Sequence, residues 1–315
     1  NVSISGGNEN ARYRISLGVL DQEGIVKKSG IKKFTASIGA NFKFLESKKL
    51  GLDINIIPSQ YREEIAPISN DAGSRGSLIG NALQWNPTEK LRLTKVGGGD
   101  SINVLVGGDL LNPVAVQEAI TDHSKVTTVL ASISPYYKFN KDLEYRFLYS
   151  INYGTGTRGT TVAPFINFND TYGKGRVRLA NSELITQQIT HTLSYNKQIT
   201  TDLNLQAVAG FEYMKYINKG NSLGGFGNSA GGFGNYGLSY EDYIQFTNPT
   251  NRAFDSYQDP TNELQSYFAR TNFNYKDKYL LTATFRADGS TKFGENNKYG
   301  YFPSLGAAWV VSKED

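Results

Sequence analysis

The sequence predicts an all-β fold, and within that class a transmembrane antiparallel β-barrel, from the alternation of its residues and the lengths of its connections. Between residues 143 and 153 apolar and polar side chains alternate, and the apolar set is Leu143, Tyr145, Phe147, Tyr149, Ile151 and Tyr153. A period of two is typical of a strand with one apolar face. Each such run holds about ten residues, enough for a tilted strand to cross a bilayer, whereas strands of soluble domains have about five or six.

The alternating runs, taken in order, predict about eleven strands. They lie at residues 2–6, 11–22, 31–44, 50–57, 126–139, 143–154, 184–197, 203–214, 264–275, 279–287 and 300–311. Short polar connections alternate with longer ones: the short set is 7–10, 45–49, 140–142, 200–202 and 276–278, and the long set is 23–30, 58–125, 155–183, 215–263 and 288–299. Because transmembrane barrels have short periplasmic turns and long extracellular loops, this sorting predicts which end of each strand faces which compartment.

Aromatic residues gather beside the short connections, at Phe42, Phe44, Tyr137, Phe139, Tyr145, Tyr195, Phe273, Tyr275 and Tyr279. Amphipathic rings at strand ends are typical of the interfacial girdle of a membrane barrel. The alternative explanation is the ordinary preference of Tyr and Phe for strands.

The long connections carry the candidate binding residues. Short helices are predicted at 74–83 and 114–120, and a glycine-rich near-duplicate occupies 224–228 and 231–235. Aromatic side chains in such loops can stack on sugar rings or grip peptides, and the alternative is that they pack the loops against one another. The candidates are Tyr61, Trp85, Phe165, Phe168, Tyr172, Phe226, Phe233, Tyr236, Tyr240 and Tyr243, with Phe254 and Tyr257.

The composition excludes several classes of function. The chain of 315 residues has no cysteine and 2 histidines, which removes thiol catalysis and disulfides and leaves little imidazole chemistry. Its net charge of +4 comes from scattered Lys and Arg residues, so no nucleic-acid surface is predicted. No apolar run is long enough for a helical span, and a mean hydropathy of −0.41 suits a barrel in which only alternate residues touch lipid.

Local motifs predict no catalytic or metal site. Residues 227–231 match the G-x-S-x-G pattern of serine hydrolases, but no apolar strand leads into them, no helix follows, and both histidines come earlier. Asp288 and Glu295 offer oxygen ligands for calcium, yet a solvated turn accounts better for this segment. Glu63 and Glu64 point apart on an extended chain. We therefore expect neither an enzyme nor a cofactor.

The most distinctive part of the sequence runs from Ser266 to Ala283 and continues through 286–290, 292–294 and 300–309. It closely resembles the SusC/RagA family of TonB-linked outer-membrane transporters. The opening segments 3–9, 16–18 and 22–25 are similar to the same family. The departures are small: Ala269 stands where glycine is common, Ala287 where a basic residue is common, and Tyr299 where tryptophan is common.

This resemblance implies a barrel of 22 strands, closed by an N-terminal plug and covered by a SusD-like surface lipoprotein. It also implies import of oligosaccharides or peptides across the outer membrane, driven by the TonB complex. Because the chain begins within an apparent strand, we expect residues 1–315 to be part of the receptor barrel, without the plug or the TonB box. The alternative is a passive porin or an adhesin-type barrel without energy coupling.

Overall fold

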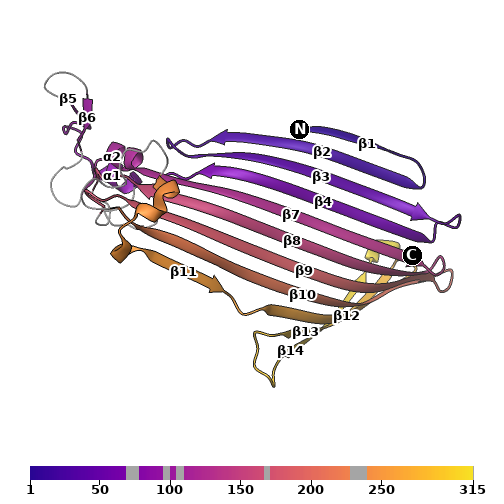
Figure 1. Cartoon of the computed structure of the whole chain (residues 1–315). Coiled ribbons are helices and arrows are strands. Elements are labelled where there is room, and N and C mark those ends of the chain that lie inside the picture. The colour runs from indigo at the N-terminus through magenta and orange to yellow at the C-terminus, as the bar shows by residue number, and fades with distance from the viewer. Residues whose placement is uncertain (69–77, 95–99, 104–109, 167–170, 228–239, 315) are drawn as a thin grey trace.

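A computed structural model describes residues 1–68, 78–94, 100–103, 110–166, 171–227 and 240–314. One curved antiparallel sheet of 12 strands dominates it, in the order β1-β2-β3-β4-β7-β8-β9-β10-β12-β13-β14, with β11 paired to β10 beside this path (Figure 1). Neighbours in the main path are antiparallel and follow one another along the chain, except that α1, β5, β6 and α2 lie between β4 and β7, and η1, η2 and β11 lie between β10 and β12. The predicted all-β antiparallel class is confirmed.

The elements have the following bounds. The first strands are β1 (Val2–Gly7), β2 (Ala11–Glu23), β3 (Gly30–Phe44), β4 (Leu50–Glu64), β7 (Ile120–Lys138) and β8 (Leu143–Val162). The remaining strands of the sheet are β9 (Arg176–Gln198), β10 (Leu203–Phe226), β11 (Ala253–Gln258), β12 (Asn262–Tyr275), β13 (Tyr279–Ser290) and β14 (Tyr299–Trp309). A separate pair comprises β5 (Arg92–Thr94) and β6 (Asp100–Ile102), and the helical segments are α1 (Leu78–Gln84), α2 (Pro113–Ala119), η1 (Tyr240–Phe246), η2 (Pro249–Asn251) and η3 (Val311–Lys313).

Several strands are longer than the alternation predicts. The prediction of loops was wrong for residues 58–64 of β4, 120–125 of β7, 155–162 of β8, 176–183 of β9 and 215–226 of β10. Past the apolar run both faces of these strands carry polar side chains, so the alternation disappears while the backbone groups continue to pair. For the same reason β11 lies inside a predicted loop, and Asp288 lies in β13 rather than in a turn.

The register places the two alternating sets on opposite faces of the sheet. Phe147 pairs with His191 and His191 with Phe211, so these rings share one face, which we call the outer face. Arg146 pairs with Tyr136 and with Thr192 on the other face, which we call the inner face. These pairings confirm the predicted separation of the two sets. The outer face carries Tyr145, Phe147, Ile151, Leu205 and Phe211, and the inner face carries Arg146, Asn152, Asn204 and Gln206.

The outer face forms a continuous aromatic and aliphatic surface. Ring centroids lie 5.2 Å apart for Phe147 and His191, 6.2 Å for His191 and Phe211, and 5.2 Å for Phe211 and Tyr267. The imidazole Nδ1 of His191 also lies 2.7 Å from the hydroxyl oxygen of Tyr145. The imidazole of His191 therefore has a hydrogen-bonding partner on its own face.

The short connections are held by their own side chains. The carbonyl oxygen Oδ1 of Asn8 accepts hydrogen bonds from two backbone N–H groups, and so does Oδ1 of Asn140. Lys276 and Asp277 have φ values of 54° and 51°, as in the two-residue turns that match the twist of a hairpin. The short-turn end and the long-loop end of the sheet lie at opposite ends of the strands (Figure 1).

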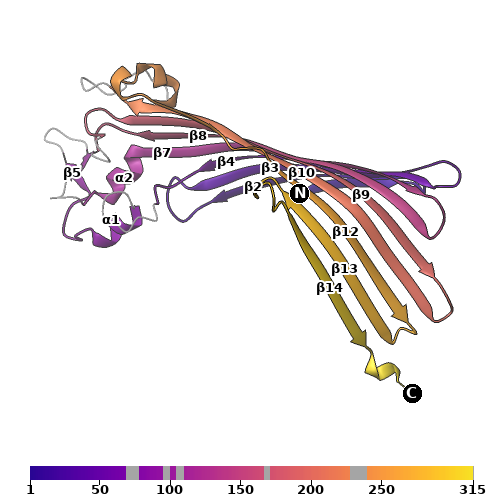
Figure 2. The ribbon, with the colours of Figure 1, turned by 90° about the horizontal axis from the view of Figure 1, so that it is seen from below.

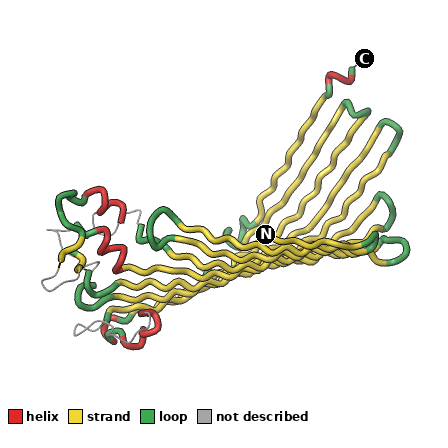
Figure 3. The backbone as a smooth tube through the Cα atoms, turned by 90° about the horizontal axis from the view of Figure 1, so that it is seen from above, coloured by secondary structure: helices red, strands yellow, loops and turns green. Residues whose placement is uncertain are grey.

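The sheet bends along its width, and β12, β13 and β14 are turned steeply away from β2, β3 and β4 (Figure 2). Helical segments, among them α1 and α2, gather at the long-loop end of the sheet (Figure 1, Figure 3). There α1 and α2 bury a small apolar core against the ends of β7 and β8, made of Leu78, Leu111, Ala115, Val116, Ala119, Ile120, Val162 and Ile166. The helices predicted at 74–83 and 114–120 are confirmed for 78–83 and 114–119, whereas Ile120 begins β7 and residues 74–77 lie outside the described residues.

No helix in the described ranges is both long and apolar enough to cross a membrane.

Candidate functional site

A groove crosses the inner face at the long-loop end, between two tyrosines. The register joins Tyr61 of β4 through neighbouring strands to Tyr257 of β11, by the successive pairs Tyr61–Val126, Val126–Gly156, Gly156–Ser182, Ser182–Gly220 and Gly220–Tyr257. We call these six residues the inner tyrosine row. Five strand spacings of about 4.8 Å separate its two ends, a distance of about 24 Å.

The floor of this row is made of small side chains. A Cβ placed on Gly220 would lie 2.7 Å from the Cε1 atom of Tyr257, so the absence of a side chain lets the ring lean over the strand. A Cβ on Gly156 would lie 3.2 Å from a methyl carbon of Val126 and 3.5 Å from the hydroxyl oxygen of Ser182. A large side chain at Gly156, which lines the groove, would therefore occupy part of it.

Charged and polar groups border the groove. Its cavity has a volume of about 400 Å³, and Glu63, Arg158, Arg178 and Asp255 are among its lining residues. The guanidinium of Arg158 donates two hydrogen bonds to Asp122, of 2.8 and 2.5 Å. These bonds raise the pKa of Arg158 above its ordinary value. The groove thus has a tyrosine at each end and both acidic and basic side chains along its border.

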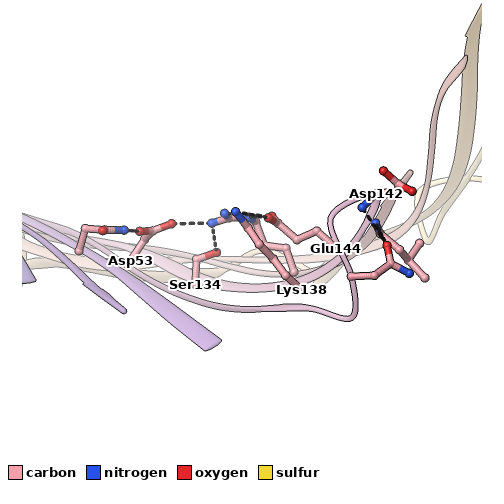
Figure 4. A network of polar contacts seen from close by, with 9 residues as sticks. Asp53, Ser134, Lys138, Asp142 and Glu144 are labelled. Atoms are coloured by element: carbon pink, nitrogen blue, oxygen red, sulfur yellow. Dashed lines mark hydrogen bonds and ion pairs between the residues drawn. The ribbon is translucent and has the colours of Figure 1, made fainter. Parts of the chain in front are cut away.

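Near the short-turn end, the inner face carries a polar network centred on Arg146, whose partners Asp53, Ser134 and Glu144 are labelled in Figure 4. Its guanidinium donates to Asp53 at 2.5 Å, to Glu144 at 3.2 Å and to Ser134 at 3.3 Å. The guanidinium carbon also lies 4.5 Å from the ring centroid of Tyr136. Asp53, Ser134 and Glu144 belong to β4, β7 and β8, so one arginine connects three strands.

A second network on the inner face is centred on Arg286 of β13. Its guanidinium donates to Asp288 at 2.7 Å, to Ser266 at 3.0 Å and to Glu212 at 3.2 Å. Glu212 accepts a further hydrogen bond of 2.9 Å from Gln188. The inner face is therefore hydrophilic and well ordered between the groove and the short-turn end.

The structure places the predicted aromatic residues in several different surroundings. Tyr61 lies in β4 and Tyr257 in β11, and both line the groove. Phe226 ends β10, with the side-chain cations of Lys174 and Arg176 at 5.8 and 5.6 Å from its ring centroid. Trp85, Phe165 and Tyr172 lie outside the groove, and the indole N–H of Trp85 donates to the carbonyl of Glu89 at 3.2 Å.

The other predicted residues are described less fully. Tyr240 and Tyr243 belong to η1, although only their backbone is described, and Phe254 lies exposed in β11. Phe168, Phe233 and Tyr236 lie outside the described residues, as does most of the glycine-rich duplicate. The prediction missed four residues that line the groove, namely Gly156, Arg158, Ser182 and Arg178. They lie where the strands continue above the apolar run, so extending the predicted strands into the predicted loops would have found them.

Comparisons with known proteins agree with this architecture. Residues 68–314 match the family model described as TonB dependent receptor-like, beta-barrel. The chain is 30% identical to TonB-dependent receptor P3 of Formosa agariphila and 29% identical to TonB-dependent receptor SusC of Bacteroides thetaiotaomicron, in both cases over 100% of its length. It spans about 30% of the length of these curated relatives.

Solved structures show the same fold. The RagAB peptide transporter superposes with a TM-score of 0.80 at 18% identity, covering 99% of this chain and 34% of that one. The ferric citrate transporter FecA superposes with a TM-score of 0.51 over 97% of this chain and 37% of that one. The sheet is thus a portion of an outer-membrane barrel, with short periplasmic turns and long extracellular loops. The chain belongs to the TonB-dependent receptor β-barrel family of the SusC/RagA type, whose members are outer-membrane transporters and not enzymes.

Proposed function

We propose that this chain forms the cargo-facing part of an outer-membrane importer that takes up oligosaccharides or peptides. The observation that carries the proposal is the inner tyrosine row, which lies at the extracellular end of a receptor barrel and faces its interior. Cargo entering from outside meets this surface before it reaches the centre of the barrel.

The chemistry of the groove supports both cargo classes. Tyrosine rings stack on the apolar faces of sugars, and carboxylates such as Glu63 and Asp255 accept hydrogen bonds from hydroxyl or amide groups. The distance between the two tyrosines, about 24 Å, corresponds to about seven residues of an extended peptide. Peptide transport is the described activity of RagAB, and that similarity supports the peptide class for this chain.

The proposal includes energy coupling through TonB and a SusD-like lipoprotein over the long loops. Membership in the TonB-dependent receptor family supports the first, and the fold shared with RagAB supports the second. In the complete protein, the networks around Arg146 and Arg286 would face the plug that closes such barrels. The other predicted aromatic residues remain proposed contacts of cargo or lipoprotein. They are Trp85, Phe165, Phe168, Tyr172, Phe226, Phe233, Tyr236, Tyr240 and Tyr243.

Uptake by cells that produce the complete protein tests this function. Fluorescent oligosaccharides and oligopeptides of graded length are offered to cells with and without an intact TonB complex. We expect accumulation of one class, and its loss when TonB is removed. Uptake that persists without TonB would instead identify a passive porin, and the absence of any uptake or cargo binding would favour an adhesin-type barrel.

Substitutions in the groove test where cargo binds. Gly156→Trp fills the floor of the row and should abolish cargo binding, while Tyr61→Ala and Tyr257→Ala should each weaken it about tenfold. Tyr275→Ala is the matched control, because this exposed tyrosine ends β12 at the short-turn end of the sheet, outside the groove. Equal binding by all four variants would exclude the groove as the cargo site, even if TonB-dependent uptake were intact.

A further inference from the structure

Three cationic side chains stand next to one another on the outer face at the extracellular end. Lys32 of β3 pairs with Arg62 of β4, and Arg62 pairs with Lys125 of β7. Paired residues on neighbouring antiparallel strands have Cβ atoms about 5 Å apart and point to the same side. We call these three residues the outer cationic row.

The charges of this row are incompletely neutralised. Lys32 makes an exposed ion pair of 3.2 Å with Asp21, whereas Arg62 and Lys125 make no ion pair with any described residue. Like charges directly opposite each other destabilise a sheet, so their juxtaposition calls for an anionic partner. By contrast, Lys219 of β10 is paired with Glu183 at 2.8 Å.

The row stands at the height of lipid headgroups. Twelve residues separate Phe44 from Lys32 on β3, Leu50 from Arg62 on β4, and Tyr137 from Lys125 on β7. At about 3.3 Å per residue and a tilt of about 40°, this is a rise of about 30 Å. The apolar band of such barrels is about 25 Å tall, so the three cations lie a few ångströms beyond its extracellular edge.

The row also borders a concave site. A cavity of about 1050 Å³ is lined by Lys32, Arg62 and Lys125 together with the connection between β2 and β3. That connection is fixed in place, because the backbone carbonyl of Lys27 accepts a hydrogen bond of 2.9 Å from Gln117 of α2 and the ammonium of Lys28 donates one of 3.2 Å to the carbonyl of Glu118. The site is therefore formed before a ligand arrives.

We propose that the outer cationic row binds the phosphate of a phosphorylated glycolipid in the outer leaflet of the outer membrane. Arg and Lys form strong charge-assisted hydrogen bonds with phosphate oxygens. Arg62 stands between Lys32 and Lys125, and its planar guanidinium can donate several hydrogen bonds to one phosphate. The carboxylates of Glu23 and Glu64 line the same cavity farther from the membrane, where the sugar hydroxyls of a glycolipid lie.

The test measures binding of lipid A to the complete protein in detergent, by native mass spectrometry and fluorescence titration. Phosphorylated lipid A should bind the unmodified protein, and the triple variant Lys32→Gln, Arg62→Gln, Lys125→Gln should bind it at least about tenfold more weakly. Enzymatically dephosphorylated lipid A should bind both proteins equally weakly. A Lys32→Arg, Lys125→Arg variant keeps the charges and should retain binding.

The control removes the same number of charges at the other end of the strands, through Lys43→Gln, Lys141→Gln and Lys197→Gln, and should leave binding unchanged. Inorganic phosphate at millimolar concentration should not displace the lipid, because the acyl chains contact the adjacent apolar face. Equal binding by the triple variant, or by dephosphorylated lipid A, would overturn the proposal. Lipid binding is measured without transport, so the outcome is independent of the proposed import function.

Discussion

Arg146 of β8 and Arg286 of β13 occupy equivalent positions in two copies of one arrangement on the inner face. Arg146 is paired with Tyr136, which is paired with Gly51, and Arg286 is paired with Phe268, which is paired with Gly210. Each arginine contacts an acidic residue that follows the glycine by two positions, which is Asp53 for Arg146 and Glu212 for Arg286. Each also contacts a serine that precedes the aromatic residue by two positions, which is Ser134 in the first copy and Ser266 in the second.

The geometry explains why each member of the arrangement is needed. A Cβ on Gly51 would lie 2.1 Å from the Cζ atom of Tyr136, and a Cβ on Gly210 would lie 2.3 Å from the Cζ atom of Phe268. The aromatic ring thus covers the glycine of one neighbouring strand while the arginine of the other strand lies over the ring. Each copy links three consecutive strands by side-chain contacts in addition to their backbone pairing.

The ion pair between Arg286 and Glu212 is expected to contribute about 1 kcal/mol to stability, because both groups remain partly exposed to solvent. A double-mutant cycle of Arg286→Met and Glu212→Gln, measured by urea unfolding of the complete protein in lipid, gives this coupling. The same cycle with Arg286→Met and Gln206→Ala should give a coupling near zero. A coupling near zero for Glu212 as well would mean that solvent screens the pair completely.

Gly51→Ala should destabilise the protein by about 1–3 kcal/mol, because the added methyl group displaces the buried ring of Tyr136. Gly39→Ala is the matched control on the same face of the adjacent strand, since nothing lies within 4 Å of its added Cβ. That control should be neutral or stabilising by a few tenths of a kcal/mol. Both values come from urea midpoints, and equal values would show that Tyr136 moves aside at no cost.

Ala209→Arg should cost about 2–4 kcal/mol, because this outer-face residue lies near the middle of the apolar run 203–213. Gln206→Arg on the inner face of the same strand should cost less than about 1 kcal/mol. Folding into lipid vesicles, monitored by the gel shift of the folded barrel, provides both measurements. The reverse order of costs would contradict the assignment of the two faces.

The contact between Glu183 and Lys219 predicts a dependence of stability on pH at the extracellular end of β9 and β10. The hydrogen bond from Lys219 holds the pKa of Glu183 below its ordinary value of 4.5. Its stabilisation is therefore complete above about pH 4.5 and is lost as the pH falls through the lowered pKa. Urea unfolding between pH 6 and pH 3 should show a smaller decline for Glu183→Gln than for the unmodified protein. Identical declines would assign the acid sensitivity to other carboxylates.

The sequence was sufficient to predict the membrane-spanning part of the sheet, because lipid imposes a strict alternation there. The positions of the short turns and the facing of residues such as Phe147 and Arg146 followed from it. The upper parts of the strands were missed because water on both sides removes the constraint that creates the pattern. Tyr61 and Tyr257 were predicted as binding residues, but their shared row depends on pairings between strands far apart in sequence.

The pleat makes the two surfaces at the extracellular end depend on each other. Tyr61 and Arg62 are consecutive residues of β4, and the first belongs to the inner tyrosine row while the second belongs to the outer cationic row. Inserting or deleting one residue below them would exchange the two, turning the tyrosine toward the bilayer and the arginine toward the interior. During evolution such a strand can therefore lengthen or shorten below this point only by two residues at a time if both side chains are to keep their faces. The connecting loops have no alternating faces to preserve, so their length can change by one residue at a time.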